Sequence, residues 1–562
     1  MHKDAYIMPY LNAQARVLGA KLPMLPKDIK TWEARRQVVR AELAKALGLP
    51  EREPMKAQIT NTYEKDGLIW EDVDFLWADH TFVSGRVMRP KDVKGKLPTI
   101  VSPPGWLYGL GSGVDFCEHM AKQGYLVMIV DDPRVNKRQN AFAGQYGVAA
   151  SAGTQAMGIQ VFDNLRALDY VLTRDDVDQG RIGVCGLCQG SEQTWLAAAL
   201  DDRFQMAIPV CGTTTYETWA CMPFEQEVSL SDPSPWVWGI LQHTDWHEIA
   251  ACIAPRPVLI VSNSGDGWWP LEGYNKVTDT LEVVFGMYGV PDKFQHIRRL
   301  ECHDFMPFIK EIDAWFDKYL KGLPPSHAAP LPCGKVDKQN FSMIQHFAEQ
   351  MAKNAKPLPT TLDKWNMERD KALGWLRENY VFMGDKLGDT VGLYLQAEES
   401  LCCEIVAIPM NEKLKCMLQV RYLKANTGKK MPTVIVSGES NRSVSWTCEC
   451  VSKELAMQGY LVATPEHMHG CERLVDLYGV GDSVDIPPLA IRLWDDMATV
   501  EYLLGRSDVD AKCLTIVGTG IGAVDACMTA ALDERVAAAA CLGGATTMQD
   551  WAAHSAEFFH HD

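Results

Sequence analysis

The feature of this sequence that most constrains its fold is an internal repeat. Residues 97–134 match residues 431–468 at an offset of 334, and both stretches contain the segment QGYLV. Residues 158–212 match residues 490–544 at an offset of 332. A helix-like stretch near the N-terminus, TWEARRQVVRAEL, recurs as KWNMERDKALGWL. Segments that keep one order and nearly one offset indicate a duplication.

Each copy alternates short apolar runs with longer amphipathic stretches. The runs TIVSPP, YLVMIV, RIGVCG and PVLIVSNS are short, apolar and rich in β-branched residues. This alternation is typical of βαβ units, so we predict an α/β fold with a mostly parallel, doubly wound sheet and helices on both faces. Catalytic residues in such sheets lie at the carboxyl ends of the strands.

A proline-rich stretch containing LPPSHAAPLP and KPLP joins the two copies. We therefore expect a catalytic domain with an N-terminal helix over residues 1–325, a linker over 326–360, and a degenerate, incomplete second copy over 361–562. The run VAAAACLGG should be the edge strand of that second copy. Exposed edges invite pairing, so we expect this one to dock on the first copy or on another subunit of a homo-oligomer.

The strongest chemical signal lies between a strand-like run and a helix-like run. There the sequence GLCQG has the G-x-C-x-G form of a nucleophile elbow, with cysteine in the place of serine. The flanking glycines permit a sharp turn, and the following helix N-terminus favours a thiolate. We predict that Cys188 is a nucleophile rather than one more buried thiol beside Cys185. The corresponding residue of the second copy is Gly520, which carries no nucleophile.

An acid and a base follow in chain order. Asp266 comes after the strand-like run PRPVLIVSNSG, although aspartate is also common in turns. His303 stands between the last strand-like run and the last helix-like run, and His296 within that strand is the alternative base. Nucleophile, acid and base in this order are typical of α/β-hydrolases. We predict that His303 takes the thiol proton and that Asp266 fixes the imidazole tautomer. At the repeat offsets, the positions matching Asp266 and His303 fall beyond residue 562, so only the first copy is expected to be catalytic.

The remaining parts of the predicted site are an oxyanion hole and a substrate pocket. We expect the backbone amides of Gln189 and Trp106 to bind the oxyanion. Loop residues expected to line the substrate site are Tyr108, Trp268, Trp269 and Arg134. For the aromatic residues the alternative is capping of the core, and for the arginine it is a solvated loop.

The first copy resembles the α/β-hydrolases of the dienelactone hydrolase and acetylxylan-esterase-like group. The stretches DDVDQGRIGVCGLCQG, ALDDRFQMAIPVCG, IAPRPVLIVSNSGDGWWPLEG and CHDF carry this resemblance over most of residues 28–322. The segment after APRPVLIV is similar to the acetylxylan-esterase-like side, whereas the cysteine nucleophile is a dienelactone hydrolase feature. Polyester synthases also use a cysteine elbow, but they differ around His303 and lack the duplication. The resemblance implies hydrolysis of a carboxylic ester or lactone through an acyl-enzyme thioester, without a metal or organic cofactor.

Other functions remain open at this point. An acyltransferase would use the same acyl-enzyme, and a non-catalytic hydrolase-like scaffold would only bind a partner. His243 and His247 have the spacing of helical metal ligands, but no third ligand is evident, so no metal is expected. Cys185 and Cys188 form a C-x-x-C pair, yet Cys185 should lie inside a strand, which argues against a redox function.

Composition narrows the classes of partner and compartment. The net charge of −17 argues against nucleic acid as a partner. No apolar run is long enough for a membrane helix, and the N-terminus does not resemble a signal peptide, so we expect a cytoplasmic protein. The odd total of 17 cysteines, with Cys185, Cys513 and Cys541 in apolar runs, predicts reduced and buried thiols.

Overall fold

The structure is a computed structural model. It describes residues 8–106, 109–111, 113–135, 137, 152–221, 236–264, 269–300, 303–336, 339, 343–380, 391–397, 400–410, 415–438, 446–465 and 488–542. The chain forms two compact units: the first contains most of residues 15–354, and the second contains residues 355–547 together with the start of α1 up to Gln14. Among the described residues, no helix is both long and apolar enough to cross a bilayer.

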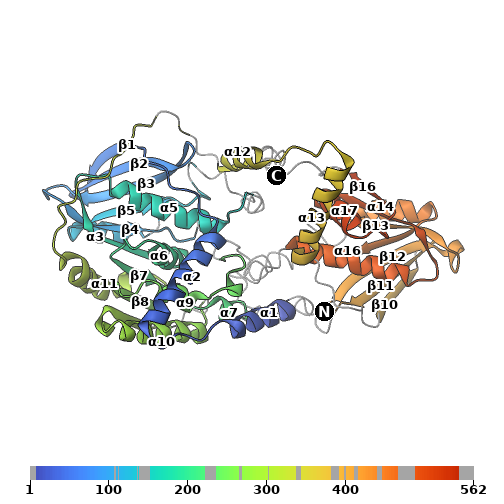
Figure 1. The fold of residues 1–562 in the computed structure, drawn as a ribbon, viewed down its shortest axis with the longest axis horizontal. Coiled ribbons are helices and arrows are strands. Elements are labelled where there is room, and N and C mark those ends of the chain that lie inside the picture. The colour runs from blue at the N-terminus through green and yellow to red at the C-terminus, as the bar shows by residue number, and fades with distance from the viewer. Residues whose placement is uncertain are drawn as a thin grey trace. The chain divides into compact units, whose positions relative to one another are not determined.

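A nine-stranded sheet forms the centre of the first unit, in the order β1-β2-β3-β5-β4-β6-β7-β8-β9 (Figure 1). Its strands are β1 (Ala57–Lys65), β2 (Leu68–Ala78), β3 (Thr81–Pro90), β4 (Leu97–Ser102), β5 (Leu126–Val130), β6 (Val177–Leu187), β7 (Met206–Val210), β8 (Val258–Asn263) and β9 (Phe294–Arg299). The pairs β1–β2, β2–β3 and β3–β5 are antiparallel, and the pairs from β5 to β9 are parallel. The central strands β4, β5 and β7 are buried throughout because both of their faces are covered. The predicted α/β fold with a mostly parallel sheet is confirmed.

Helices cover both faces of this sheet. The helices of the N-terminal half are α1 (Met8–Lys21), α2 (Ile29–Leu47), α3 (Val114–Lys122), α5 (Ala156–Val171), α6 (Gln189–Leu200), α7 (Tyr216–Trp219), α9 (Trp246–Ala251), α10 (Leu271–Met287), α11 (Ile309–Phe316) and α12 (Met343–Asn354). In Figure 1, α3 and α11 lie on one side of the strands, and α5, α6 and α2 lie on the other. Every residue of α5 is buried because α5 contacts the sheet, α6 and α2.

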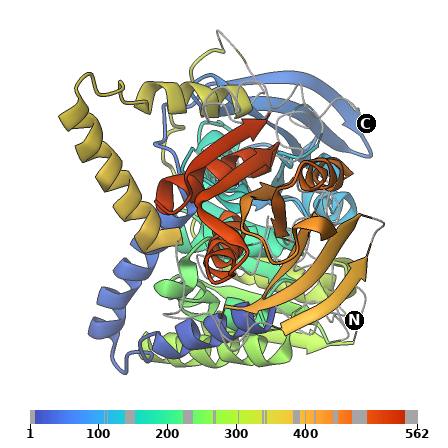
Figure 2. The same cartoon turned by 90° about the vertical axis from the view of Figure 1, so that its right-hand side faces the viewer.

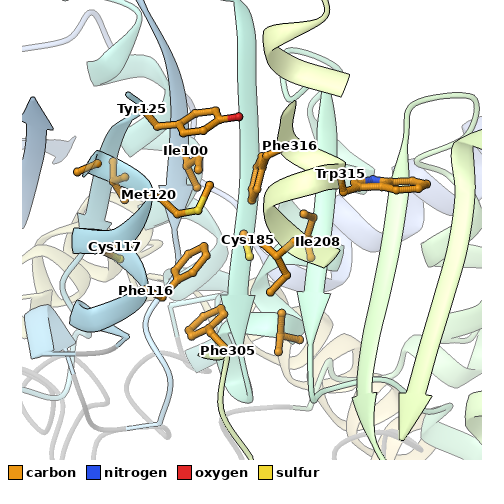
Figure 3. Close-up of a cluster of buried hydrophobic side chains, with 14 of the residues drawn as sticks. Ile100, Phe116, Cys117, Met120, Tyr125, Cys185, Ile208, Phe305, Trp315 and Phe316 are labelled. Atoms are coloured by element: carbon orange, nitrogen blue, oxygen red, sulfur yellow. The ribbon is translucent and has the colours of Figure 1, made fainter. Parts of the chain in front are cut away.

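The apolar core under α3 and α11 is shown in Figure 3. Phe116 and Met120 of α3 and Phe316 of α11 pack over the sheet, where Cys185 of β6 is fully buried. Phe305, from the loop after β9, stacks on Phe116 with ring centroids 4.2 Å apart. The core therefore holds the loop that carries the predicted base.

The second unit holds a seven-stranded sheet in the order β10-β11-β12-β14-β13-β15-β16. Its strands are β10 (Val391–Ala397), β11 (Leu401–Pro409), β12 (Lys415–Leu423), β13 (Met431–Ser437), β14 (Leu461–Pro465), β15 (Val509–Thr519) and β16 (Ala538–Leu542), and its helices are α13 (Leu362–Tyr380), α14 (Trp446–Met457), α16 (Pro488–Leu504) and α17 (Ile521–Leu532). Figure 2 shows this unit from its own side, with the antiparallel strands in orange and the last parallel strands in red. In order and direction, these strands match the first seven strands of the larger sheet.

The two units also share a partly buried charge arrangement in which one arginine pairs with two carboxylates. In each unit the guanidinium lies 2.7 Å from a glutamate and 2.8 Å from an aspartate. The residues are Arg174, Asp176 and Glu71 in the first unit and Arg506, Asp508 and Glu404 in the second. These positions are related by offsets of 332 and 333, so the repeat in the sequence is matched by a repeat in side-chain contacts.

Much of the segment treated as a linker from the sequence, residues 326–360, packs on the first unit. Backbone amides tie it there by donating from Ser326 to Asp178, from Leu331 to Leu172 and from Gly334 to Met55. In α12, His346 and Phe347 meet the ring of Trp77 edge-on at 5.2 and 6.4 Å. Proline content alone predicted a linker, but these aromatic contacts and hydrogen bonds pack the segment on the first unit as far as the end of α12.

Two of the three cysteines expected to be buried are exposed. Cys185 is buried inside β6 as predicted, whereas Cys513 and Cys541 are exposed. Cys513 lies in an exposed stretch near the start of β15. Cys541 lies in β16, the last strand of its sheet, all of whose residues are exposed. An apolar run therefore did not guarantee burial where the strand is at an edge.

Candidate active site

Cys188 occupies the turn between β6 and α6. Its backbone has φ 62° and ψ −124°, and it stands at the N-cap of α6. Positive φ is uncommon for a residue with a side chain and costs about 1–3 kcal/mol. The Cys188 amide donates to the Val210 carbonyl at 2.9 Å, which ties the turn to the end of β7. Strand, sharp turn and helix are therefore arranged as the elbow motif predicts.

The flanking glycines are required by close backbone contacts. A Cβ on Gly186 would lie 2.3 Å from the carbonyl oxygen of Gly190. A Cβ on Gly190 would lie 2.6 Å from the carbonyl oxygen of Pro103 and 3.0 Å from that of Pro104. Only glycine allows the loop after β4 to press against the first turn of α6. The elbow and the predicted oxyanion loop are thus in direct contact.

A buried network of side-chain amides lies beside the elbow. Gln193 donates to the Pro104 carbonyl at 3.1 Å, and Asn164 donates to the Gln193 side chain at 2.7 Å. Gln160 donates to the Gln189 side chain at 3.4 Å. We call Gln160, Asn164, Gln189 and Gln193 the amide network; all four are buried. It connects α5, α6 and the loop after β4.

The two predicted oxyanion donors belong to the segments that this network joins. Gln189 is the first residue of α6 and is 4% exposed. Trp106 lies in the loop after β4, and its side chain is 41% exposed, so it faces solvent rather than the core. The contacts of Gly190 and Gln193 with the preceding prolines bring the two segments together. The oxyanion role of their amides stays a prediction.

Arg134 lies close to the elbow, but its guanidinium already has protein partners. It pairs with Asp132 through two hydrogen bonds of 2.8 and 2.6 Å. It also donates to the Gln189 side chain at 2.5 Å. A substrate carboxylate would have to share Arg134 with these two residues. The structure thus places Arg134 beside the predicted nucleophile and gives it an orienting contact with the residue that follows Cys188.

His303 lies in the loop between β9 and α11 and stacks on Trp269. The two rings are nearly parallel, with an interplanar angle of 8° and centroids 5.5 Å apart. Trp269 is 8% exposed and also contacts Trp219 of α7 at 6.4 Å. One of the predicted pocket residues is therefore in contact with the predicted base.

The predicted acid lies outside the described residues, as do Tyr108 and Trp268. The strands on either side can nevertheless be compared. Strands β8 and β9 pair in parallel up to Asn263 and Arg299, and the Ser264 amide donates to the Arg299 carbonyl at 2.9 Å. Asp266 and His303 thus follow the carboxyl ends of adjacent strands, the location at which catalytic residues of such sheets gather. The acid role of Asp266 stays a prediction.

The alternative histidines have other surroundings. His296 lies on β9, and its Nδ1 is 3.1 Å from the hydroxyl of Tyr274 in α10. His247 is buried in α9, and burial, with nearby Lys276, lowers its pKa to about 3. His243 is exposed, with Glu42 3.7 Å away. Within the described ranges, no three histidine, cysteine, aspartate or glutamate side chains gather as metal ligands.

Sequence reasoning missed the amide network and Asp132. Glutamine and asparagine in amphipathic helices normally face solvent, so nothing local singled them out. A signal was present in the repeat, because Gln160 and Gln193 correspond to Arg492 and Asp525 at the offset of 332. A paired change from neutral to oppositely charged residues indicates that the two positions touch.

Parts of the chain are similar to known proteins in sequence and structure. Residues 83–227 match the dienelactone hydrolase family. Over 279 residues the chain is 26% identical to "Putative hydrolase YtaP" of Bacillus subtilis (strain 168), covering 47% of this chain and 92% of that protein. Over 336 residues it is 25% identical to a 4-O-methyl-glucuronoyl methylesterase of Phanerochaete carnosa (strain HHB-10118-sp), covering 53% of this chain and 78% of that protein. A solved glucuronoyl esterase from Solibacter usitatus aligns at 17% identity and a TM-score of 0.44, covering 54% of this chain and 99% of that chain. The first half of the chain is thus similar to the dienelactone hydrolase family over residues 83–227.

Proposed function

We propose that the first unit hydrolyses a carboxylic ester or lactone, with Cys188 as its nucleophile. The observation that carries this proposal is the backbone of Cys188, held at φ 62° at the N-terminus of α6. A strained conformation at a residue with a reactive side chain is typical of a functional turn. The positive end of the α6 dipole favours the thiolate, which is the nucleophilic form.

In the first half of the proposed reaction, His303 takes the proton of the Cys188 thiol. The thiolate attacks the acyl carbonyl, and the amides of Gln189 and Trp106 bind the oxyanion that forms. The intermediate then collapses, the carbon–oxygen bond to the leaving group breaks, and the His303 imidazolium protonates the departing alkoxide. The product of this half is a thioester on Cys188.

In the second half, His303 takes a proton from water, which attacks the thioester carbonyl. Collapse of that intermediate breaks the carbon–sulfur bond and releases the carboxylic acid, and the sulfur regains its proton. Asp266 would hold the imidazole in the tautomer that presents Nε2 to the sulfur. An added alcohol or amine that replaces water at this step would make the same site an acyltransferase.

The names of related proteins guide the choice of substrate. A 4-O-methyl-glucuronoyl methylesterase is among the relatives, and the matched family is that of dienelactone hydrolases. Both names point to an ester or lactone of a carboxylic acid. We therefore place methyl esters of uronic acids first in the substrate panel, followed by lactones, acetyl esters and aryl esters.

The test measures hydrolysis of this panel by the native protein, Cys188→Ala, Cys188→Ser and His303→Ala. Iodoacetamide labelling followed by peptide mass spectrometry reports the reactivity of Cys188 directly. We expect turnover and selective labelling in the native protein, loss of both in Cys188→Ala, and slower labelling in His303→Ala. Full activity in Cys188→Ala would overturn the proposal. Absence of turnover together with absence of labelling at Cys188 would favour a non-catalytic scaffold.

We further propose that the second unit is a non-catalytic duplicate of the first. The matching strand orders and the matching arginine–carboxylate groups support this. So does the second elbow, in which Gly520 occupies the N-cap of α17 with φ 57° and ψ −125°. A protein with Gly520→Cys and Cys188→Ala should remain inactive, because an elbow alone supplies no base.

A further inference from the structure

We propose that Trp269 is a positioning residue for His303, and that its indole face sets the plane in which the imidazole works. The inference rests on the proposed function, in which His303 is the base. The observation behind it is the parallel stack of the two rings, 5.5 Å apart at an angle of 8°.

An imidazole that moves protons needs to be held in two independent ways. A carboxylate bonded to one ring nitrogen fixes the tautomer and limits rotation within the ring plane. It does little to stop the ring from tilting about that hydrogen bond. A flat aromatic surface packed on the ring face resists this tilt, and it also stabilises the imidazolium that forms when the thiol proton is transferred.

Trp269 is suited to this task because it is itself well supported. Its ring contacts Trp219, which stacks on Trp236 with centroids 4.9 Å apart. Tyr216 stacks on Trp236 at 5.4 Å and meets Trp246 edge-on at 5.0 Å. These five rings, which we call the aromatic column, are all at least 92% buried. Trp269 therefore cannot retreat from His303 without disturbing a packed core.

The end of the aromatic column formed by Tyr216 and Trp246 is fixed by hydrogen bonds. Asp245 caps α9 and accepts the amides of Tyr216 at 2.8 Å and Trp246 at 2.6 Å. Thr215 caps α7. The side chains of Tyr216 and Trp246 thus start from a backbone that is held in place.

The loop that carries His303 is anchored on its other side. Phe305, two residues further along, is 2% exposed and stacks on Phe116 of α3. Arg299, at the end of β9, donates to the Pro307 carbonyl at 2.6 Å and closes the loop at its base. His303 is therefore presented from a fixed loop to a fixed aromatic face.

The placement of Trp269 in the chain adds a second consequence. Trp269 and Asp266 are three residues apart in the connection between β8 and α10. The residue proposed to orient the imidazole and the residue that stacks on it are thus near neighbours in the sequence.

The test compares two substitutions that differ in the flatness of the side chain. Trp269→Phe keeps a planar face, whereas Trp269→Met keeps an apolar side chain without one. We expect Trp269→Met to lower kcat by about 10²-fold with KM changed by less than about threefold, because a misplaced base slows the chemistry and leaves binding intact. Trp269→Phe should recover most of this loss. Labelling of Cys188 by iodoacetamide should slow in the methionine variant and recover in the phenylalanine variant.

The matched control is Trp315→Met. Trp315 lies in α11, is 6% exposed and contacts Tyr319, so its loss removes a similarly buried indole from another part of the unit. The positioning role is wrong if Trp269→Met changes kcat no more than Trp315→Met does, or if Trp269→Phe is as slow as Trp269→Met at equal thermal stability. Full turnover in Cys188→Ala would instead overturn the proposed function itself, so the two failures are distinguishable.

Discussion

The elbows at Cys188 and Gly520 have nearly the same backbone and opposite chemical capacity. Their φ and ψ angles are 62° and −124° at Cys188, and 57° and −125° at Gly520. The Cys188 amide donates to the Val210 carbonyl at 2.9 Å, and the Gly520 amide donates to the Leu542 carbonyl at 3.4 Å. Each acceptor is the last residue of the next strand. The turn therefore forms without a nucleophile. Glycine adopts it at little steric cost, whereas cysteine does not, so the strain at Cys188 accompanies its side chain.

The side chains packed beside the two elbows differ as well. In the first unit, the neutral Gln193 donates to the loop carbonyl of Pro104. In the second unit, Arg492 donates to the corresponding Gly438 carbonyl at 2.8 Å and pairs with the fully buried Asp525. At this position the first unit has side-chain amides, which add only dipoles, and the second unit has an ion pair. The buried ion pair beside the first elbow lies elsewhere, between Arg134 and Asp132.

The largest effect that tests this comparison is on catalysis. Cys188→Ala should lower kcat/KM by about 10³-fold or more, because the proposed acyl-enzyme can no longer form. Gly520→Ala should leave turnover within about twofold of the native rate. Both are measured with the best ester of the panel. Equal losses in the two variants would contradict the assignment of catalysis to the first unit.

The next largest effect is on the stability of the second unit. Asp525→Asn leaves the Arg492 charge buried without its counter-ion and should lower the free energy of unfolding by about 3–5 kcal/mol. The matched change in the first unit, Gln193→Leu, removes one neutral amide and should lower that unit's free energy of unfolding by about 1–3 kcal/mol. Hydrogen exchange followed by mass spectrometry can compare α16 and α17 with α5 and α6. A larger loss of unfolding free energy in Gln193→Leu than in Asp525→Asn would contradict this difference between the two units.

A smaller effect should come from backbone strain. Gly520→Ala places a Cβ at positive φ and should destabilise the second unit by about 1–3 kcal/mol. Glycine is usually less stabilising than alanine, but at the positive φ of Cys188 we expect the reverse. Cys188→Gly should be more stable than Cys188→Ala by about 1 kcal/mol. Denaturant unfolding of the four proteins measures both differences. Equal stability of Cys188→Gly and Cys188→Ala would mean that the turn stores no strain.

The last effect depends on pH and concerns His247. Its folded pKa of about 3 lies below the ordinary value of 6.5, because burial disfavours the imidazolium. As the pH falls, the unfolded chain therefore binds a proton at His247 before the folded chain does. The free energy of unfolding is unaffected above pH 6.5 and decreases by about 1 kcal/mol per pH unit as the pH falls from 6.5 towards 3. Burial also raises the pKa of Asp245 to about 6, which has the opposite effect between pH 6 and 3.8. His247→Gln should leave the first unit more resistant to acid than the native protein.

Chemical unfolding at pH 7 and pH 5 measures this slope, and Asp245→Asn is its counterpart, with a steeper loss in acid. A slope unchanged by His247→Gln would assign the acid sensitivity to other groups.

The parts of the molecule that followed from sequence are those with strong local patterns. Strand alternation predicted the parallel sheet, and GLCQG predicted the turn at Cys188 because glycine spacing and backbone geometry are directly linked. The stack of His303 on Trp269 depends on two loops meeting in space, which no local pattern encodes. The amide network was missed for a related reason, since a buried Gln193 reads like any polar residue of a helix. The proline-rich stretch after the first unit was predicted to be a linker, although its contacts were decided by tertiary packing.

The packing of α12 has a practical consequence for dissecting the protein. A first unit produced alone and ended at residue 325 would uncover Trp77, whose indole is fully buried and meets His346 and Phe347. Ending the fragment at Asn354 keeps this helix and the strand-like bridge between Lys56 and Gly334. Ending the fragment after α12 therefore keeps the apolar surface around Trp77 covered. It would also let the esterase question be asked of one unit without the other.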